Sequence, residues 1–492
     1  MIGAGVAGTG TSRSAVTAAP SRRSGPLIAG LSLVVLTTAV LQTAVVPVLG
    51  VIADQLNTSL VTVSWAVTAN LLAAAAATPL IGRLADLYSK KWVLLAVLMV
   101  VLVGSVLAAT TASVPLLITG RILQGASYAL YPISIAILRD ELAEDRLMGA
   151  MAVLSGTLGF GGGTGLVVTG LLMAGDAGYH RVFWLTTAFT VVVIIAAAVV
   201  IPARRPSATG TIDWLGAVGL AVGLSAVLLG VTQGNSWGWA APATLGFLVG
   251  GAAVLVGWWL WERRAAQPLV STFMLTRRPI LLTNIATIFV GMGLYFAFLG
   301  LTQFVQMPRD AEGYGFSATV LQASVYFLLP GAVAGFLVAL VSGRFIDRFG
   351  ARRVLVVAAL AGIAGFVTLA VAHDRAWQVI VAGVLANAYI SLGYGALPAL
   401  VVSEVDVGQT GVATSMNAIA RTIGSSTAAA VVAVMLGHAL VPPETSFIVI
   451  FVAGAVTAAL ALALIAVSRA PDRHDASVET MSETRAMNHE WG

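Results

Sequence analysis

Long apolar runs alternate with short polar segments along almost the whole chain. Most runs hold about 20 or more largely apolar residues, the length that a helix needs to cross a bilayer core. They lack the alternation of apolar and polar residues that barrel strands show, so the pattern predicts spanning helices. The fold class is therefore an all-α polytopic membrane protein with fourteen spans, expected at 27–53, 61–82, 93–112, 114–137, 148–173, 182–201, 214–233, 241–261, 279–306, 319–341, 354–372, 376–403, 410–437 and 446–467.

Composition agrees with a protein that uses the lipid bilayer as its solvent, because 58% of the residues are hydrophobic and only 10% are charged. The chain has no cysteine, and its five histidines lack the spacing of metal ligands. We therefore expect no metal and no cofactor. Neither lysine, Lys90 or Lys91, lies in a Gly-Lys-Ser/Thr phosphate loop, which argues against direct use of ATP. We expect a protein that is not an enzyme and that draws any energy it needs from a gradient.

The 26 Lys and Arg residues are distributed unevenly between the two sets of loops. Only Arg181, Arg309 and Arg375 fall on the side opposite the termini, and Arg121 and Arg421 lie inside spans. Cytoplasmic loops carry the excess of cations, so we expect both termini in the cytoplasm. The basic balance then reflects membrane topology, and we expect no nucleic-acid partner.

One charged segment occurs twice. Gly82-Arg83-Leu84-Ala85-Asp86 begins the first copy, which runs to Lys91, and Gly343-Arg344-Phe345-Ile346-Asp347 begins the second, which runs to Arg353. The first copy follows the second expected span and the second follows the tenth, which indicates two related bundles, an organisation typical of transporters. We expect an arm at 1–26, a six-helix bundle at 27–201, a linker and inserted helix pair at 202–278 with spans 214–233 and 241–261, a second six-helix bundle at 279–467 and a tail at 468–492.

These two signature segments, together with the inserted pair, resemble the major facilitator superfamily and its fourteen-span branch of drug:proton antiporters. The resemblance covers residues 27–467. It implies a monomeric secondary active exporter that moves amphipathic small organic molecules or drugs outward by alternating access, driven by the proton motive force. The chain uses Arg in preference to Lys and has many Ala and Gly residues, a composition typical of a GC-rich bacterial genome. We therefore expect the protein in the bacterial inner membrane.

The resemblance assigns the signature segments to a conformational latch. Asp86 is expected to meet the amino end of a late helix near Gly408 to Gly411, with Arg83 and Arg146 completing the network. Carboxylates are stabilised at helix amino ends, which gives this expectation its physical basis. The alternative is that the charges only determine topology. The latch residues expected in the two copies are Gly82, Arg83, Asp86 and Arg146, and Gly343, Arg344 and Asp347.

The fourth span carries Gly120-Arg121-Ile122-Leu123-Gln124-Gly125, which resembles the motif whose arginine takes part in proton coupling. An arginine at the centre of a span costs about 2.5–3.5 kcal/mol on insertion scales, so Arg121 should face a partner or a polar interior. Gln124, Tyr128 and Tyr131 lie within three turns and are expected to line a central cavity. The alternative is a structural arginine bonded to carbonyls of the first span.

The fifth span is rich in glycine and occupies the place of the superfamily's antiporter motif, although the expected proline is missing. Gly159 with Gly163, and Gly161 with Gly165, form pairs at four-residue spacing that permit close helix approach. Generic helix packing is the competing interpretation. A dinucleotide fingerprint is excluded because no strand precedes these glycines.

The first span departs from the branch pattern because Gln42 stands where these exporters commonly carry an aspartate. No carboxylate lies deep in any expected span, and Asp54, near an outer end, is the acidic candidate for proton coupling beside Arg121. Both the preference for cationic drugs and coupling through a buried acid are weakened. A neutral or anionic metabolite is the alternative cargo, favoured by Arg121 and Arg421.

The second bundle offers further candidates for the cavity, although each could instead form a bond between helices. An alternative of another class is a membrane sensor or lipid-binding scaffold that does not transport. The candidates for the cavity are Gln42, Gln124, Tyr128 and Tyr131 in the first bundle and Asn284, Tyr295, Gln303, Tyr326, Asn387, Asn417 and Arg421 in the second.

Overall fold

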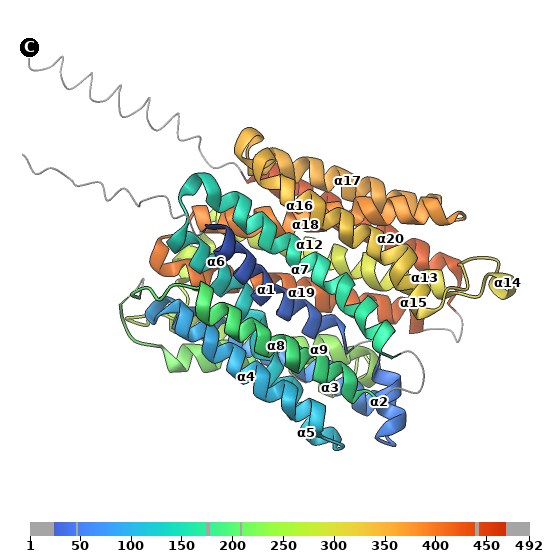
Figure 1. Ribbon diagram of the computed structural model, residues 1–492, viewed down its shortest axis with the longest axis horizontal. Helices are drawn as coiled ribbons and strands as arrows, with labels where there is room; N and C mark the ends of the chain where they lie inside the picture. The colour runs from blue at the N-terminus through green and yellow to red at the C-terminus, as the bar shows by residue number, and fades with distance from the viewer. Residues whose placement is uncertain (1–23, 46–47, 174–177, 207–208, 438–441, 469–492) are drawn as a thin grey trace, which may run out of the picture.

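The protein is a bundle of long helices that run roughly along one axis (Figure 1). The computed structural model describes residues 24–45, 48–173, 178–206, 209–437 and 442–468, and within these ranges it contains no strand. Thirteen helices in this described part of the chain are long and apolar enough to cross a membrane. A further crossing consists of α5 (Val114–Gly125), the 3₁₀ turn η2 (Ala126–Ala129) and α6 (Leu130–Glu141) in direct succession. The expected fourteen spans are confirmed.

Most helices from the first part of the chain pack against one another, with α1 against α7 and α8, α3 against α5, and α4 against α5 and α8, while α7 also packs extensively against α16 (Leu329–Phe349) and α18 (Ala376–Ser403) from the last part of the chain. Ser59 caps the start of α3 by accepting a bond from Thr62 N at 3.1 Å, as serine commonly does at this position. With α5, η2 and α6, this group comprises α1 (Ser24–Thr43), α2 (Leu49–Gln55), α3 (Leu60–Leu87), α4 (Lys90–Thr110), α7 (Glu144–Leu172) and α8 (His180–Val200).

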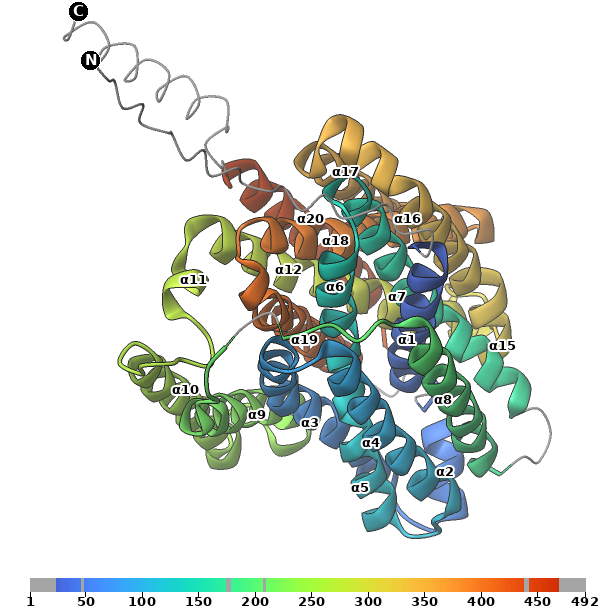
Figure 2. The ribbon, with the colours of Figure 1, turned by 60° about the vertical axis from the view of Figure 1, so that its left-hand side comes forward.

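Helices from the last part of the chain form a second group, and the pair α9 (Trp214–Trp237) and α10 (Pro242–Glu262) lies on the outside of the bundle (Figure 2). Asp213 caps α9 by accepting a bond from Gly216 N at 2.8 Å. The remaining elements are α11 (Thr272–Thr276), α12 (Arg278–Tyr295), η3 (Phe296–Gly300), α13 (Leu301–Gln306), α14 (Arg309–Glu312), α15 (Val320–Gln322), η4 (Ala323–Leu328), α16 (Leu329–Phe349), α17 (Ala351–Val371), α18 (Ala376–Ser403), η5 (Val407–Gln409), α19 (Thr410–Gly437) and α20 (Glu444–Val467).

Several helix ends differ from the sequence expectation. The expected first span at 27–53 is divided, because α1 ends at Thr43 and α2 is a separate helix. The sequence has Pro47 at this point, and a proline disfavours helical geometry in the residue before it. In contrast, α3 and α16 continue beyond the expected ends at 82 and 341, so both signature glycines lie within helices. Apolar length determines where a span leaves the hydrocarbon, whereas the helix itself can continue into water.

Two π-helical segments, η3 and η4, interrupt crossings of the second group. Pro330 follows η4 in the first turn of α16 and has no N–H to donate into the preceding turn. A π-turn holds one more residue than an α-turn and rotates the side chains around it about the helix axis.

Exposed tryptophans mark both ends of the bundle. Each lies within a few residues of a helix end, where an amphipathic indole fits the boundary between lipid and water. Trp92, Trp214 and Trp261 lie at the end that carries the signature segments, here called the signature side, and Trp184, Trp239 and Trp377 lie at the opposite side.

Candidate functional site

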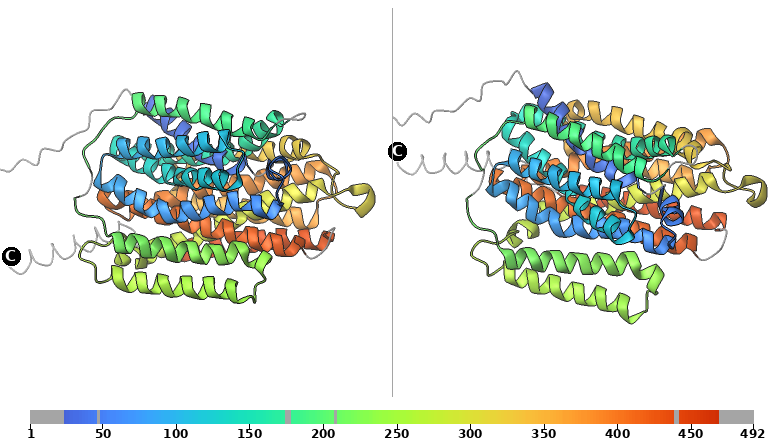
Figure 3. Two further views of the ribbon diagram at one scale, coloured as in Figure 1. Left: turned by 90° about the horizontal axis from the view of Figure 1, so that it is seen from below. Right: turned by 60° about the horizontal axis from the view of Figure 1, so that its bottom comes forward.

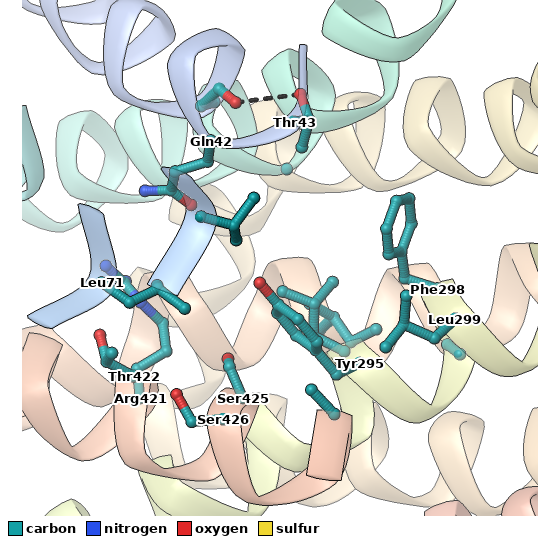
Figure 4. Close-up of a pocket in the computed structure, with 18 of the residues that line it drawn as sticks. Gln42, Thr43, Leu71, Tyr295, Phe298, Leu299, Arg421, Thr422, Ser425 and Ser426 are labelled. Carbon is teal, nitrogen blue, oxygen red and sulfur yellow. Dashed lines mark hydrogen bonds between the residues drawn. The ribbon is translucent and has the colours of Figure 1, made fainter. Parts of the chain in front are cut away.

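A cavity of about 660 Å³ lies between the two helix groups, within the size range of small-molecule sites. Its walls come from α1, α3, η2 and α7 of the first group and from α12, α18 and α19 of the second. Lining residues such as Val67 at the start of α3 and Ala433 near the end of α19 place it toward the side opposite the signature segments. Figure 4 shows Gln42 on one wall and Arg421, Thr422, Ser425 and Ser426 on the facing wall.

The charge of this cavity is positive. Arg121 and Arg421 are its lining cations, and among the described residues that line it there is no Asp, Glu, Lys or His. An ionised group in a site of low dielectric attracts the opposite charge more strongly than it would in water. The cavity is therefore suited to neutral or anionic groups.

Arg121 is held by main-chain and side-chain acceptors through its Nε and Nη1. Its Nε donates to Ala66 O at 3.2 Å, and its Nη1 donates to Leu41 O at 3.1 Å and to Gln124 Oε1 at 2.6 Å. Gln124 Nε2 in turn donates to Ser105 Oγ at 2.9 Å. These bonds tie α5 to α1, α3 and α4, which fits the structural interpretation of Arg121.

Gly125 makes this network possible. A Cβ at this position would lie 2.7 Å from Asn70 O on α3, so only glycine permits the two helices to come this close. Gln124 is fully buried and does not line the cavity, contrary to the sequence expectation, because its amide is used between Arg121 and Ser105.

Arg421, on α19, has a different environment. Its guanidinium lies 5.0 Å from the ring centroid of Tyr131 and 4.8 Å from that of Tyr394. Within the described residues it has no hydrogen bond and no ion pair, so its donors are available to the cavity that it lines. Aromatic faces stabilise a cation without neutralising it. Arg421 is thus the cation best placed to meet a bound molecule.

Other predicted residues divide between the cavity wall and bonds between helices. Gln42, Tyr128, Tyr295 and Asn387 line the cavity as expected. Tyr131 does not, because its hydroxyl bonds Ser155 Oγ at 2.6 Å and donates to Tyr394 O at 3.0 Å.

The paired asparagines Asn284 and Asn417 also lie outside the cavity lining. Asn417 Nδ2 donates to Asn284 Oδ1 at 2.9 Å and to Thr287 Oγ1 at 2.8 Å. Their expected place on the cavity wall is therefore corrected: they join α12 to α19, because a carboxamide inside a membrane bundle is stabilised by a polar partner on the next helix.

Three further candidates lie away from the cavity. Tyr326, within η4, is 61% exposed, and Gln303, just after η3, is also exposed. Both were expected on the wall as polar residues of the second bundle, and their expected place is corrected: they lie within or next to a π-segment, which changes the direction of the side chains around it. Asp54 is exposed on α2 and does not line the cavity either, because α2 is separate from α1.

The signature side is closed by contacts between the two groups. Asp86, at the end of α3, is fully buried, and its carboxylate accepts bonds from Gly411 N at 2.9 Å and Val412 N at 3.0 Å. These N–H groups belong to the first turn of α19, where they have no acceptor within the helix and carry the positive end of its dipole. This contact lies at the end of the stretch Gly408 to Gly411 that the resemblance indicated, and the role of the contact as a latch stays a prediction. Gly82 lies against Ser415 on the same helix, with no room for a side chain.

A cation that the sequence did not single out also joins the two groups on this side. Arg139, on α6, donates to Thr410 Oγ1 at 2.6 Å and to Val405 O at 2.7 Å. Arg146 is exposed and pairs with none of the described side chains, and the Nε of Arg83 has no acceptor among them. Arg83 does interact electrostatically with Asp86, as Lys90 also does. The expected place of Arg146 in this network is wrong, because α6 passes nearer to the amino end of α19 than the start of α7 does.

The second signature segment makes a simpler contact. Gly343 on α16 lies against Gly149 on α7 with no room for a side chain between them. Arg344 is exposed, and the side chain of Asp347 lies outside the described residues. At the edge of the same side, Arg204 makes a two-bond ion pair with Glu141 at 2.6 and 3.0 Å, which raises the pKa of Arg204.

The glycines of α7 allow this helix to lie between the two groups. Gly161 and Gly165 face α1 at Ala39 and Thr43, whereas Gly163 faces Ala332 of α16. Gly159 and Gly163 also line the cavity. The close approach expected from four-residue spacing is present, and the antiporter role of this helix stays a prediction.

Residues 31–429 match the family model described as Major Facilitator Superfamily. The chain belongs to this superfamily. It is 29% identical over 434 residues to an uncharacterized transporter of the superfamily from Mycobacterium tuberculosis, with 84% of this chain and 61% of that protein covered. The chain thus spans about 61% of the length of this relative.

Two relatives have names that state a cargo. The tetracenomycin C resistance and export protein of Streptomyces glaucescens is 28% identical, with 78% of this chain and 71% of that protein covered. The uridine/deoxyuridine transporter of Lactococcus lactis is 27% identical, with 73% and 75% covered. Among solved structures, the human organic anion transporter MFSD10 superposes with a TM-score of 0.62 at 15% identity over 90% of this chain and 99% of that chain, which supports the superfamily fold.

Sequence reasoning missed three parts of this superfamily site. Asn70 lines the cavity and donates to Arg121 O at 2.8 Å, and a polar residue inside an apolar span was the available signal. Arg139 lies among several loop cations, so nothing in the sequence distinguished it. The third part is the polar end of α9, which lines the cavity although α9 lies in the inserted pair.

Proposed function

We propose that this superfamily member is a proton-coupled exporter of amphipathic small organic molecules, with neutral or anionic cargo preferred. The observation that carries the proposal is Arg421, an arginine without an ion-pair partner among the described residues, in a cavity whose described lining has no carboxylate. A cationic cargo would meet repulsion there, whereas a carboxylate or sulfonate could accept two parallel bonds from the guanidinium.

Export by alternating access is supported by the position of the contacts. The cavity extends toward the side opposite the signature segments, while Asp86 and Arg139 join the groups at the signature side. We infer that the signature side is cytoplasmic, that the membrane is the bacterial inner membrane and that a single chain is the working unit. The positive-inside distribution of Lys and Arg supports this orientation. The described state would then be open outward.

Proton coupling is the energy source that fits the sequence. The chain offers no phosphate loop for ATP, so uphill export requires an ion gradient. One charge that crosses about 100 mV supplies about 2.3 kcal/mol, enough for a roughly 50-fold gradient of cargo.

The test is flux in proteoliposomes under an imposed pH gradient. Anilinonaphthalene sulfonate serves as the amphipathic anion and tetraphenylphosphonium as the cation, each measured for the parent, Arg421→Leu and Arg421→Lys. We expect gradient-driven movement of the anion, its loss in Arg421→Leu and partial retention in Arg421→Lys. Gln303→Leu is the matched control, because Gln303 is exposed outside the cavity lining. Movement of the cation alone, unaffected by Arg421, would overturn the proposed cargo class.

A further inference from the structure

The inserted helix α9 contacts both helix groups at once. It packs against α3 of the first group, where Ser225 Oγ donates to Leu72 O at 3.5 Å. It also packs against α19 of the second group, where Asn235 Nδ2 donates to Ala430 O at 3.0 Å. Figure 3 shows the α9 and α10 pair as a layer on the outside of the bundle. α9 thus lies across the seam between α3 and α19.

α10 does not share this position, since it packs mainly on α9. Only 17% of the residues in its membrane-spanning window are buried, against 39% in α9. Most of α10 therefore faces lipid, and it is α9 that covers the seam. Without α9, the cavity edge between α3 and α19 would be open to hydrocarbon.

The polar residues of α9 gather at its end beside the cavity. Thr232, Gln233, Asn235 and Ser236 all line the cavity, next to Ala429 and Ala430 of α19. Polar groups on a spanning helix are stabilised where they face a polar space or a partner in place of lipid, which gives their position on a cavity wall a physical reason. Asn235 is already used, because its Oδ1 accepts a bond from Trp239 Nε1 at 2.8 Å in addition to its bond to Ala430 O.

Gln233 differs from these neighbours. Its side chain is 7% exposed, and its Oε1 accepts a bond from Ser236 Oγ at 2.7 Å. Its Nε2 has no partner among the described residues, so an amide donor on the cavity wall is free to bond a molecule in the cavity. Such a donor gains a net bond when an acceptor arrives.

We propose that α9 forms a cargo-contacting wall of the transport cavity and that Gln233 is a specificity-determining residue, which donates a hydrogen bond to an oxygen of an anionic or neutral amphiphile. The inserted pair would then be part of the binding site. This inference rests on the proposed transport function and adds a second donor, on a different helix, to Arg421.

The chain has no cysteine, so Gln233→Cys gives a single reactive site. A water-soluble maleimide reacts with the thiolate, which forms in a hydrated cavity and not in lipid. We expect Gln233→Cys to label, and Val222→Cys, on the exposed face of α9 where the side chain is 52% exposed, to stay unlabelled in proteoliposomes. Equal labelling of both positions, or labelling of neither, would overturn the proposal that α9 forms a wall of the cavity.

Cargo contact is tested by protection and by affinity. Anilinonaphthalene sulfonate should slow labelling of Gln233→Cys, and Gln233→Leu should weaken its binding about fivefold, the loss of one net hydrogen bond. Val222→Leu should bind as the parent does. Labelling that the anion does not slow, together with unchanged affinity in Gln233→Leu, would overturn the assignment of Gln233. Protection by tetraphenylphosphonium alone would support the position of α9 in the cargo-contacting wall and would overturn the proposed preference for anionic cargo.

Discussion

Replacement of Asp86 by asparagine should open the signature side. Asp86 is fully buried, and its two oxygens accept bonds from Gly411 N and Val412 N at the amino end of α19. Asparagine keeps one accepting oxygen, turns an NH₂ group toward the other N–H and removes the charge that the helix dipole favours.

A hydrogen bond to a charged group contributes about 1.5–3 kcal/mol, so the loss of one bond and the weakening of the other costs about 2–4 kcal/mol. At about 1.4 kcal/mol for each factor of ten, the ratio of closed to open signature side should fall by about 30-fold to about 1,000-fold. If the parent protein favours the closed signature side by less than this factor, the variant should favour the open one.

The measurement is a distance distribution between two spin labels, for which the absence of cysteine is convenient. Tyr88→Cys and Val407→Cys place labels after α3 and before α19, where the native side chains are 56% and 47% exposed. Asp86→Asn should move the population to longer distances. The control is Arg146→Gln, because Arg146 has no partner among the described side chains. If Asp86→Asn and Arg146→Gln both match the parent, the contact at α19 does not hold the two groups together.

Three further substitutions test other contacts. Arg139→Gln removes the bonds to Thr410 and Val405 and should shift the same labels toward longer distances by about tenfold in population; unchanged distances would contradict this. Gly165→Leu forces a side chain against Thr43 and should lower the free energy of unfolding by about 1–3 kcal/mol in thermal unfolding, while Gly246→Leu, with open space beside it, should leave it unchanged. Arg121→Leu leaves buried acceptors without donors, so it should lower thermal stability by more than about 2 kcal/mol; a stable variant with altered cargo selectivity would refute the structural interpretation.

Only some contacts of the site could be predicted from the sequence. The resemblance to the superfamily indicated that Asp86 meets the amino end of α19, and the attraction between a carboxylate and a helix amino end gives this contact its physical basis. It could not select Arg139 over Arg146, since both are loop cations a few residues apart and only the path of α6 past α19 distinguishes them. Nor could the sequence distinguish the two intramembrane arginines: Arg121 is held by acceptors on neighbouring helices, whereas Arg421 lines the cavity without a hydrogen bond to any described residue.

The sequence by itself determined the membrane class, the fourteen crossings and the duplicated signature, because the length of an apolar run and the cost of a charge in lipid act locally. Tertiary structure alone decided which face of each helix meets the cavity. In a helix of a soluble protein, polar residues mark the outer face. In a membrane protein, the lipid and the interior of the helix bundle are about equally apolar, so the hydrophobic pattern says little about which face of a helix points inward. Two residues illustrate this. Tyr326 lies exposed within a π-segment, away from the cavity, and Gln233 lines the cavity because it belongs to the inserted helix α9.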